Sequence, residues 1–261
     1  MSGTMEAAVV GLGLFVPGHP TLAHYLVEPP SEDALVPKGE FIDPRNRRRA
    51  SVVTRALADV YAQALASSGL QASEVASVFG SALGEASTMI GILDQIFREQ
   101  GPVSPMRFVT SVHNTAAGLV SIVSKNQGFA TSIGADIDTP AMALAEGLGL
   151  VASRGMPTVV VSGEERSPEG LIPEETSWGL FAGALALVPV DAAPLGVMRV
   201  RAFVEGEPTL PFADVAPELA KSPVTGILDL VLALARRKTG LLRLDRGAGR
   251  GFTVELLAPD A

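Results

Sequence analysis

The sequence predicts a single α/β unit, and three observations carry this prediction. The chain has 261 residues, which is enough to bury one sizeable core. Hydrophobic residues make up 47% of it and charged residues only 18%, a balance typical of a globular protein with much buried surface. Short strand-like runs also alternate with segments of helical periodicity. Together these features predict a largely parallel sheet with helices on both faces.

The elements near the amino terminus have clear boundaries. A short apolar strand is expected at 7–14, closed by a proline-glycine turn, and a loop rich in proline and acidic residues follows over 28–44. Residues 51–68 carry apolar side chains near helical spacing, with Gly69 as a typical stop. This segment is therefore expected to be an amphipathic helix.

Strands and helices then alternate as far as residue 190. Runs rich in Val, Ala and Leu predict strands, and longer segments with helical spacing predict helices that pack closely where alanine and glycine are frequent. In chain order, these elements are a strand at 75–81, a helix at 89–99, a buried helix at 115–125, a strand at 130–135, a helix at 140–153, and strands at 159–162 and 180–190.

The last part of the chain is a short remainder. A strand is expected at 195–204, a Leu/Val/Ala helix at 227–237 with basic residues at its carboxyl end, and a closing hairpin of 241–244 and 252–257. We therefore expect residues 1–194 to form the main part. Residues 195–261 are expected to form a reduced βαββ remainder packed on it, within one structural unit.

Composition excludes several functional classes. The net charge of −8 argues against nucleic-acid binding, which needs a basic face. No apolar run reaches the length of a membrane span, and the amino terminus lacks the basic region of a secretory signal, so we expect a cytoplasmic protein. The absence of cysteine excludes disulfides and thiolate metal ligands, and we expect neither a cofactor nor a metal. The basic cluster at 45–49 is expected to be a solvated turn rather than a docking patch for an acidic partner.

The most informative run reads Phe108-Val-Thr-Ser-Val-His-Asn-Thr-Ala-Ala-Gly118 and continues through Ala130-Thr-Ser-Ile-Gly-Ala-Asp-Ile-Asp-Thr139. It resembles the region before and around the nucleophile of β-ketoacyl synthases. That region reads roughly Phe-Val-x-Ser, then Asn-x-x-Ala-Gly, a glycine-containing loop, and a strand ending in Ala-Cys-x-Ser/Thr. The positions that match the family's Asn, Ala-Gly and loop glycine are Asn114, Ala117, Gly118 and Gly128. On this alignment Ile137 occupies the nucleophile position.

Further segments extend the resemblance over roughly residues 5–190, in the family's order. They are 8–18, which is similar to the family's opening strand and turn, 155–165, and 178–188 with its Gly-Ala-x-Ala-Leu-Val pattern. The resemblance implies a thiolase-like fold with an intact first half and a truncated second half. The run Ser111-Val-His-Asn114, together with the short tail, is similar to the short ketosynthase-like proteins that resemble chain-length factors.

The chain departs from the family in its chemistry. A ketosynthase uses a cysteine thiolate and two histidines from the second half of its fold. Here Ile137 cannot attack a thioester, and all three histidines (His19, His24 and His113) precede it. We therefore expect no enzymatic activity from this chain alone.

The resemblance implies a noncatalytic subunit that pairs with a complete β-ketoacyl synthase as a heterodimer and shapes its acyl pocket. The pathway would be type II polyketide, aryl-polyene or fatty-acid-like biosynthesis, with acyl carrier protein as an indirect partner. The resemblance assigns Phe108, Thr110, Thr115 and Leu119 to the wall of that pocket. His113 and Asn114 are expected to hydrogen-bond backbone at the interface. The short tail is expected to leave apolar surface for the partner.

Two other functions stay open. One is a homodimeric scaffold or a protein that binds a hydrophobic ligand. The other is an acyl-thioester hydrolase or decarboxylase that uses His113 with Asp136 or Asp138. The two aspartates have the composition of a site for a hard cation, but polar caps for the following helix are favoured. Glu164 and Glu165 are expected to be surface carboxylates at a strand end.

Overall fold

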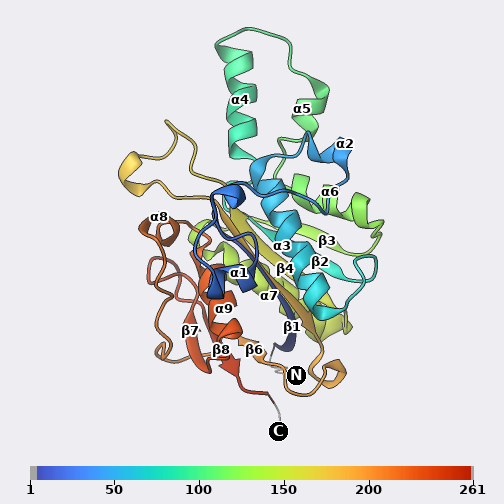
Figure 1. The fold of residues 1–261 in the computed structure, drawn as a ribbon, viewed down its shortest axis with the longest axis vertical. Helices are drawn as coiled ribbons and strands as arrows, with labels where there is room; N and C mark the ends of the chain where they lie inside the picture. Colours follow the sequence, from blue (N-terminus) through green and yellow to red (C-terminus); the bar gives the residue numbers. More distant parts are fainter. Residues whose placement is uncertain (1–4, 260–261) are drawn as a thin grey trace.

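One eight-stranded sheet organises the molecule (Figure 1). The computed structural model describes residues 5–259. The strand order is β3-β2-β4-β5-β1-β6-β8-β7. The strands are β1 (Glu6–Phe15), β2 (Ala76–Gly80), β3 (Ala130–Ile133), β4 (Thr158–Glu164), β5 (Phe181–Val188), β6 (Arg199–Ala202), β7 (Gly240–Arg243) and β8 (Thr253–Leu257). The helices are α1 (Leu22–Val27), α2 (Pro44–Arg47), α3 (Val52–Ser68), α4 (Ala86–Phe97), α5 (Pro105–Val109), α6 (Thr115–Ser124), α7 (Thr139–Arg154), α8 (Pro217–Ala220) and α9 (Thr225–Ala235).

The sheet is mixed, so the prediction of a largely parallel sheet is wrong. Strand β2 runs parallel to β3 and β4, whereas every other pair of neighbours is antiparallel. A parallel neighbour needs a crossover, usually a helix. The connection from β4 to β5 over 165–180 contains one short 3-10 turn instead. The chain therefore returns antiparallel beside β4.

Helix α3 covers one face of the sheet much as its sequence predicts. The Ser51 hydroxyl accepts a hydrogen bond from the backbone N–H of Thr54, which caps the first turn. The helix ends at Gly69, whose φ of 72° suits a residue without a side chain. Its buried side chains, among them Tyr61, share a core with residues of α6 and the central strands. Helices α7 and α9 belong to the core on the opposite side.

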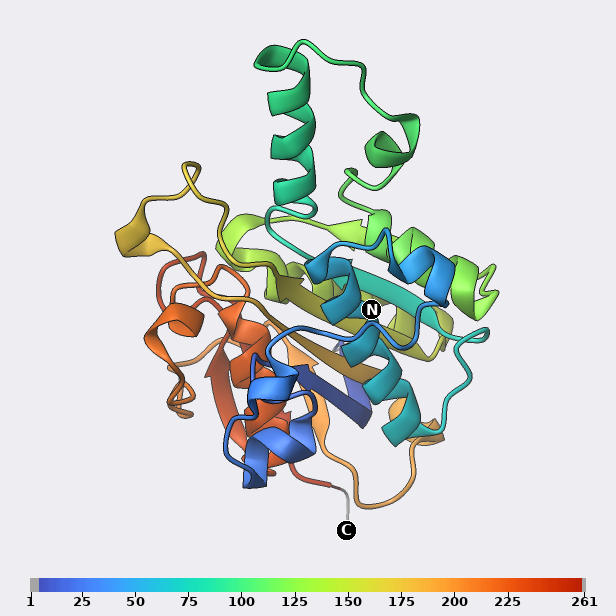
Figure 2. The same cartoon turned by 45° about the horizontal axis from the view of Figure 1, so that its top comes forward.

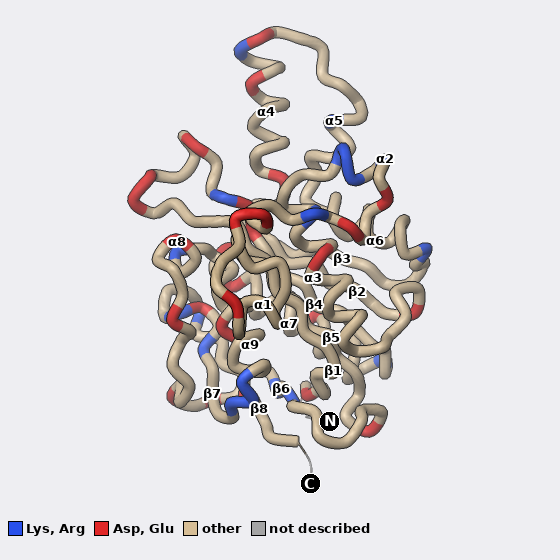
Figure 3. Tube along the Cα trace, viewed as in Figure 1, with Lys and Arg blue, Asp and Glu red and all other residues tan. Residues whose placement is uncertain are grey.

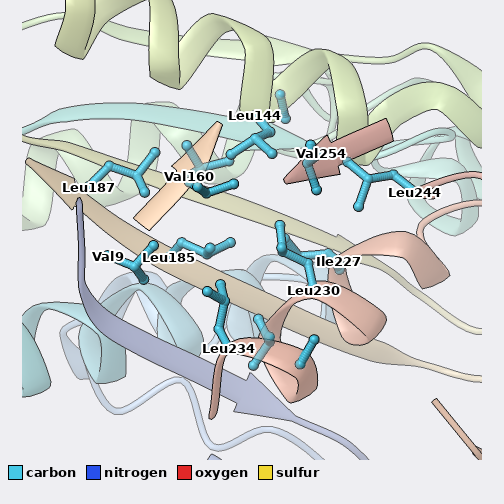
Figure 4. Close-up of a cluster of buried hydrophobic side chains, with 14 of the residues drawn as sticks. Val9, Leu144, Val160, Leu185, Leu187, Ile227, Leu230, Leu234, Leu244 and Val254 are labelled. Atoms are coloured by element: carbon cyan, nitrogen blue, oxygen red, sulfur yellow. The ribbon is translucent and has the colours of Figure 1, made fainter. Parts of the chain in front are cut away.

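The tail strands extend the first sheet instead of starting a second one. Strand β6 pairs antiparallel with β1, and β8 and β7 follow it outward. The tail therefore extends the sheet from the edge of β1. The hairpin expected at 241–244 and 252–257 is the β7–β8 pair. Helix α9 is buried along nearly its whole length and shares a core with α7 and the tail strands (Figure 4). The short tail therefore covers much of α7.

Exposed apolar surface lies elsewhere, on α6 and on a projection formed by α4 and α5. The helix expected to be buried at 115–125 forms as α6, but only three of its residues are buried and Ile122 is 70% exposed. Within residues 5–259, no helix is both long enough and apolar enough to cross a membrane.

Two glycines of α7 provide a matched test of this packing. A Cβ on Gly147 would lie 2.3 Å from Cγ2 of the buried Val160 on β4, whereas a Cβ on Gly149 would meet nothing within 4 Å. We expect Gly147→Ala to lower the free energy of unfolding by about 1–3 kcal/mol because it overpacks the α7–β4 contact. Gly149→Ala should raise it by about 0.5–1 kcal/mol through helix propensity. Denaturant melts of both variants measure the difference, and equal effects would contradict the packing described here.

Candidate functional site

An exposed apolar surface extends from the α4–α5 hairpin to α6. The hairpin, residues 86–109, projects from the end of the sheet where β2 and β4 terminate (Figures 1 and 2). We define the hairpin surface as the large hydrophobic residues here that are more than a third exposed: Met89, Leu93, Ile96, Phe97, Met106, Phe108, Val109, Val112 and Ile122. Four charged residues of the hairpin lie among them: Asp94, Arg98, Glu99 and Arg107. Red and blue segments mark charge along α4 and at the tip of the hairpin (Figure 3). Met106, Val109, Val112 and Ile122 line a single groove, and exposed apolar surface of this kind marks an interaction site.

Most of the residues that the sequence predicted for the interface lie beside this surface. A groove of about 320 Å³ lies between α2, α5 and α6, and Thr110, Asn114, Thr115 and Leu119 are among the residues that line it. Phe108 lies on α5 and is 60% exposed. The structure thus brings these predicted residues to one face, beside the exposed hairpin.

A second hollow, of about 440 Å³, separates α6 from β3. His113, Asn114 and Ser132 are among its lining residues. Strand β3 is an edge of the sheet and pairs only with β2 among the described strands. Its other side therefore presents backbone N–H and C=O groups that another strand can pair with.

His113 attaches the segment that follows the hairpin to the end of strand β2. Its Nε2 donates a hydrogen bond to the carbonyl oxygen of Ser81, just beyond β2, at 2.7 Å. The ring also packs closely on two glycines, since a Cβ on Gly84 would lie 2.8 Å from its Cδ2 and one on Gly134 would lie 3.1 Å from its Nε2. His113 therefore bonds backbone, as predicted, whereas Asn114 contributes to the walls of both hollows.

Ile137 lies in a 3-10 turn, Asp136–Asp138, between β3 and α7. Asp136 is exposed and has a φ of 50°. Asp138 takes the N-cap position of α7 as predicted, but its side chain makes no capping bond. Its carboxylate is 8% exposed, accepts the backbone N–H of Arg250 at 3.2 Å and lies 3.7 Å from that guanidinium. Neither aspartate hydrogen-bonds to His113 in the part of the chain described.

Three carboxylates are buried beneath the hairpin. The expectation that Glu164 and Glu165 are surface residues is wrong, because they are 0% and 8% exposed. Glu85, at the start of α4, is 4% exposed. The loop from Ser81 into α4 folds over the end of β4 and covers both residues. No ion pair to a basic side chain is formed by these three residues within 5–259.

Hydroxyl groups and backbone N–H groups donate hydrogen bonds to these carboxylates instead. Glu164 accepts bonds from the hydroxyl of Ser81 and from the backbone N–H groups of Ala82 (2.7 Å) and Leu83 (3.2 Å). Glu165 accepts the backbone N–H of Ser87, in the first turn of α4, at 2.7 Å. These bonds attach the beginning of the hairpin to the end of β4.

Glu85 joins the same region to α3. Its carboxylate accepts hydrogen bonds from the hydroxyls of Ser51 and Thr54, in the first turn of α3, and from Thr88. Burial raises the pKa of Glu85 above its ordinary value. Burial also raises the pKa of Glu164 to about 7, although the donors from Leu83, Ser81 and Ala82 lower it in part.

A sequence model of the β-ketoacyl synthase N-terminal domain matches residues 24–236, which is most of the chain. The chain belongs to the β-ketoacyl synthase N-terminal domain family. None of the curated proteins matches it.

Solved structures of ketosynthases share the fold, as the sequence resemblance predicted. A chain of the ketosynthase (ApeO) in complex with its chain length factor (ApeC) from Xenorhabdus doucetiae is 20% identical, with a TM-score of 0.67, and the match covers 98% of this chain and 100% of that one. A chain of the ishigamide ketosynthase/chain length factor is 18% identical, with a TM-score of 0.60 and coverage of 77% and 68%. A chain of AntDE:AntF, a type II acyl-carrier protein in complex with its ketosynthase, is 11% identical, with a TM-score of 0.67 and coverage of 98% and 100%. The chain thus has the thiolase-like fold of ketosynthases, and its residues 24–236 correspond to the N-terminal domain of that family.

Removal of the His113 side chain tests its contribution to the base of the hairpin. We expect His113→Ala to lower the free energy of unfolding by about 1 kcal/mol, since one neutral hydrogen bond and the contacts on Gly84 and Gly134 are lost. His113→Gln keeps an N–H donor at a similar reach on a flexible side chain without the ring, and it serves as the control, with a smaller loss. Thermal and denaturant melts measure both, and equal stability of His113→Ala and wild type would refute the role.

Proposed function

We propose that this chain is a noncatalytic, chain-length-factor-like subunit that pairs with a complete β-ketoacyl synthase and helps to shape its acyl pocket. The hairpin surface is the observation that carries the proposal, since an apolar face of this extent suits a protein partner. It adjoins the groove that holds Thr110, Asn114, Thr115 and Leu119, residues to which the family resemblance assigns an interface or pocket role.

The noncatalytic part of the proposal rests on Ile137, near the end of β3, and on the positions of the three histidines. Ile137 has no nucleophilic atom, and the chain has no cysteine at any position. His19 and His24 contact each other through their Nδ1 atoms at 3.1 Å, in and before α1. His113 is already bonded to the Ser81 carbonyl. A complete ketosynthase partner would supply the thiolate and the histidines.

The shape of the surface supports a heterodimer. The edge of β3 offers backbone groups for strand pairing, while α6 and the hairpin beside it offer apolar area. Two of the structures that share this fold are described as a ketosynthase with its chain length factor, and a third contains an acyl-carrier protein. In the proposed complex, Phe108 and its neighbours face the partner and limit the length of an acyl chain carried by acyl carrier protein.

Coexpression with the complete ketosynthases of the same gene neighbourhood tests the pairing. We expect a one-to-one complex on size exclusion and in native mass spectrometry. The double variant Val109→Asp/Ile122→Asp should weaken that complex by about tenfold or more, because it places two carboxylates in the apolar face. Both side chains are more than 60% exposed, so the free chain should still fold.

Leu195→Asp is the matched control, since Leu195 is 88% exposed on the loop between β5 and β6. It should leave the complex unchanged. Failure of the wild-type chain to bind any of these ketosynthases would refute the proposal. A stable homodimer that carries lipid would favour a scaffold or ligand-binding protein. Turnover of acyl-thioesters by the isolated chain, lost in His113→Ala, would favour a hydrolase or decarboxylase.

A further inference from the structure

We propose that the protonation state of Glu164 controls how firmly the base of the α4–α5 hairpin is held against the sheet, and thereby how well the hairpin surface is organised for its partner. The second half of this statement rests on the proposed function. The first half concerns the isolated chain alone and is testable without a partner.

The geometry makes Glu164 a shared attachment point. Its carboxylate lies at the end of the central strand β4 and is bonded to three consecutive residues after β2: Ser81, Ala82 and Leu83. These residues lead directly into α4, the first arm of the hairpin. Opening of this short segment would remove one of the contacts that hold the start of α4, beside the Glu165–Ser87 bond and the bonds of Glu85 to α3.

The second arm of the hairpin is attached to the same residue. Ser81 accepts the hydrogen bond from His113 through its carbonyl oxygen, and donates to Glu164 through its hydroxyl. The hydroxyl of Ser81 also accepts the backbone N–H of Gly84, on which the His113 ring packs. Displacement of Ser81 would therefore loosen both ends of the hairpin together.

The charges around Glu164 make this attachment sensitive to protons. Its neighbour Glu165 adds like-charge repulsion, and Glu85 faces Glu165 from the start of α4. His113 approaches from the loop before α6 but is bonded to the Ser81 carbonyl rather than to a carboxylate. No arginine or lysine ion-pairs with Glu164 in residues 5–259. As a neutral acid, Glu164 can donate its proton to the Ser81 hydroxyl and still accept the two backbone N–H groups.

The direction of the pH effect follows from linkage. The pKa of Glu164 is raised from 4.5 to about 7 when the segment is closed, and it returns toward 4.5 when opening hydrates the carboxylate. Between these two values the closed state binds one more proton than the open state. Closure is therefore weakened as pH rises from 4.5 to about 7, and it becomes independent of pH above that value.

Hydrogen exchange on the isolated full chain measures this directly. The probes are the backbone amides of Ala82 and Leu83, which donate to Glu164, with protection factors corrected for intrinsic exchange. We expect their protection to fall by roughly forty-fold between pH 5 and 7 and to level off above pH 7. Glu164→Gln should remove most of this dependence because the amide does not titrate.

Two further variants keep the test decisive. Glu175→Gln, at an exposed position of the 165–180 loop, is the matched control and should leave the profile unchanged. Ser81→Ala removes a hydrogen bond that lowers the pKa of Glu164, so it should move the start of the level region to higher pH.

A flat wild-type profile from pH 5 to 8 would overturn the proposal, as would an unchanged pH dependence in Glu164→Gln. Neither result bears on the proposal that the chain binds a ketosynthase, which is tested separately. A complex with a ketosynthase whose affinity does not change between pH 5.5 and 7.5, despite the expected exchange profile, would refute only the link to the partner. Absence of any complex would refute the proposed function and leave the anchoring by Glu164 intact.

Discussion

Burial of α7 and α9 in one apolar core is the constraint on which the rest of the structure depends. By adding β6, β8 and β7 to the edge of β1, the chain encloses α7 and α9 in a core that includes Leu144, Ile227 and Val254. Within residues 5–259, the elements of the tail pack on the β1 side of the sheet and do not cover the α4–α5 hairpin or the outer face of α6. Apolar surface is therefore left at the opposite edge of the sheet, beside β3.

The hairpin surface and the buried carboxylates are two parts of one arrangement. A projecting hairpin has little core of its own, so its position depends on how its base is held. Here the base is held by polar contacts: Glu164 to the segment after β2, Glu165 to the first turn of α4, and His113 to Ser81. Buried polar networks of this kind fix one geometry while they remain fully satisfied. The same contacts make the geometry responsive to protonation.

The sequence alone was enough to predict elements with local signals. Helix α3 was predictable because Ser51 and Gly69 mark its ends, and the thiolase-like fold followed from the ordered motifs. The antiparallel pairing of β5 with β4 was not predictable, because it depends on the absence of a crossover helix from the 165–180 connection. Burial of Glu164 and Glu165 was missed because a Gly-Glu-Glu sequence at a strand end gives no sign of the loop that folds over it. The exposure of Ile122 was missed for a similar reason, since coverage of an apolar helix face depends on distant segments. The one available signal was the pair of glutamates, Glu164 and Glu165, directly after a predicted strand.

The central claim is that a ketosynthase covers the surface formed by α4, α5 and α6. Footprinting of the purified mixture by hydrogen exchange or carbene labelling tests it most directly, because both methods report which segments a partner covers. The account predicts that residues 89–122 and strand β3 become protected while β7, at the far edge of the sheet, stays unchanged. Protection confined to that far edge, or no protection at all, would contradict it.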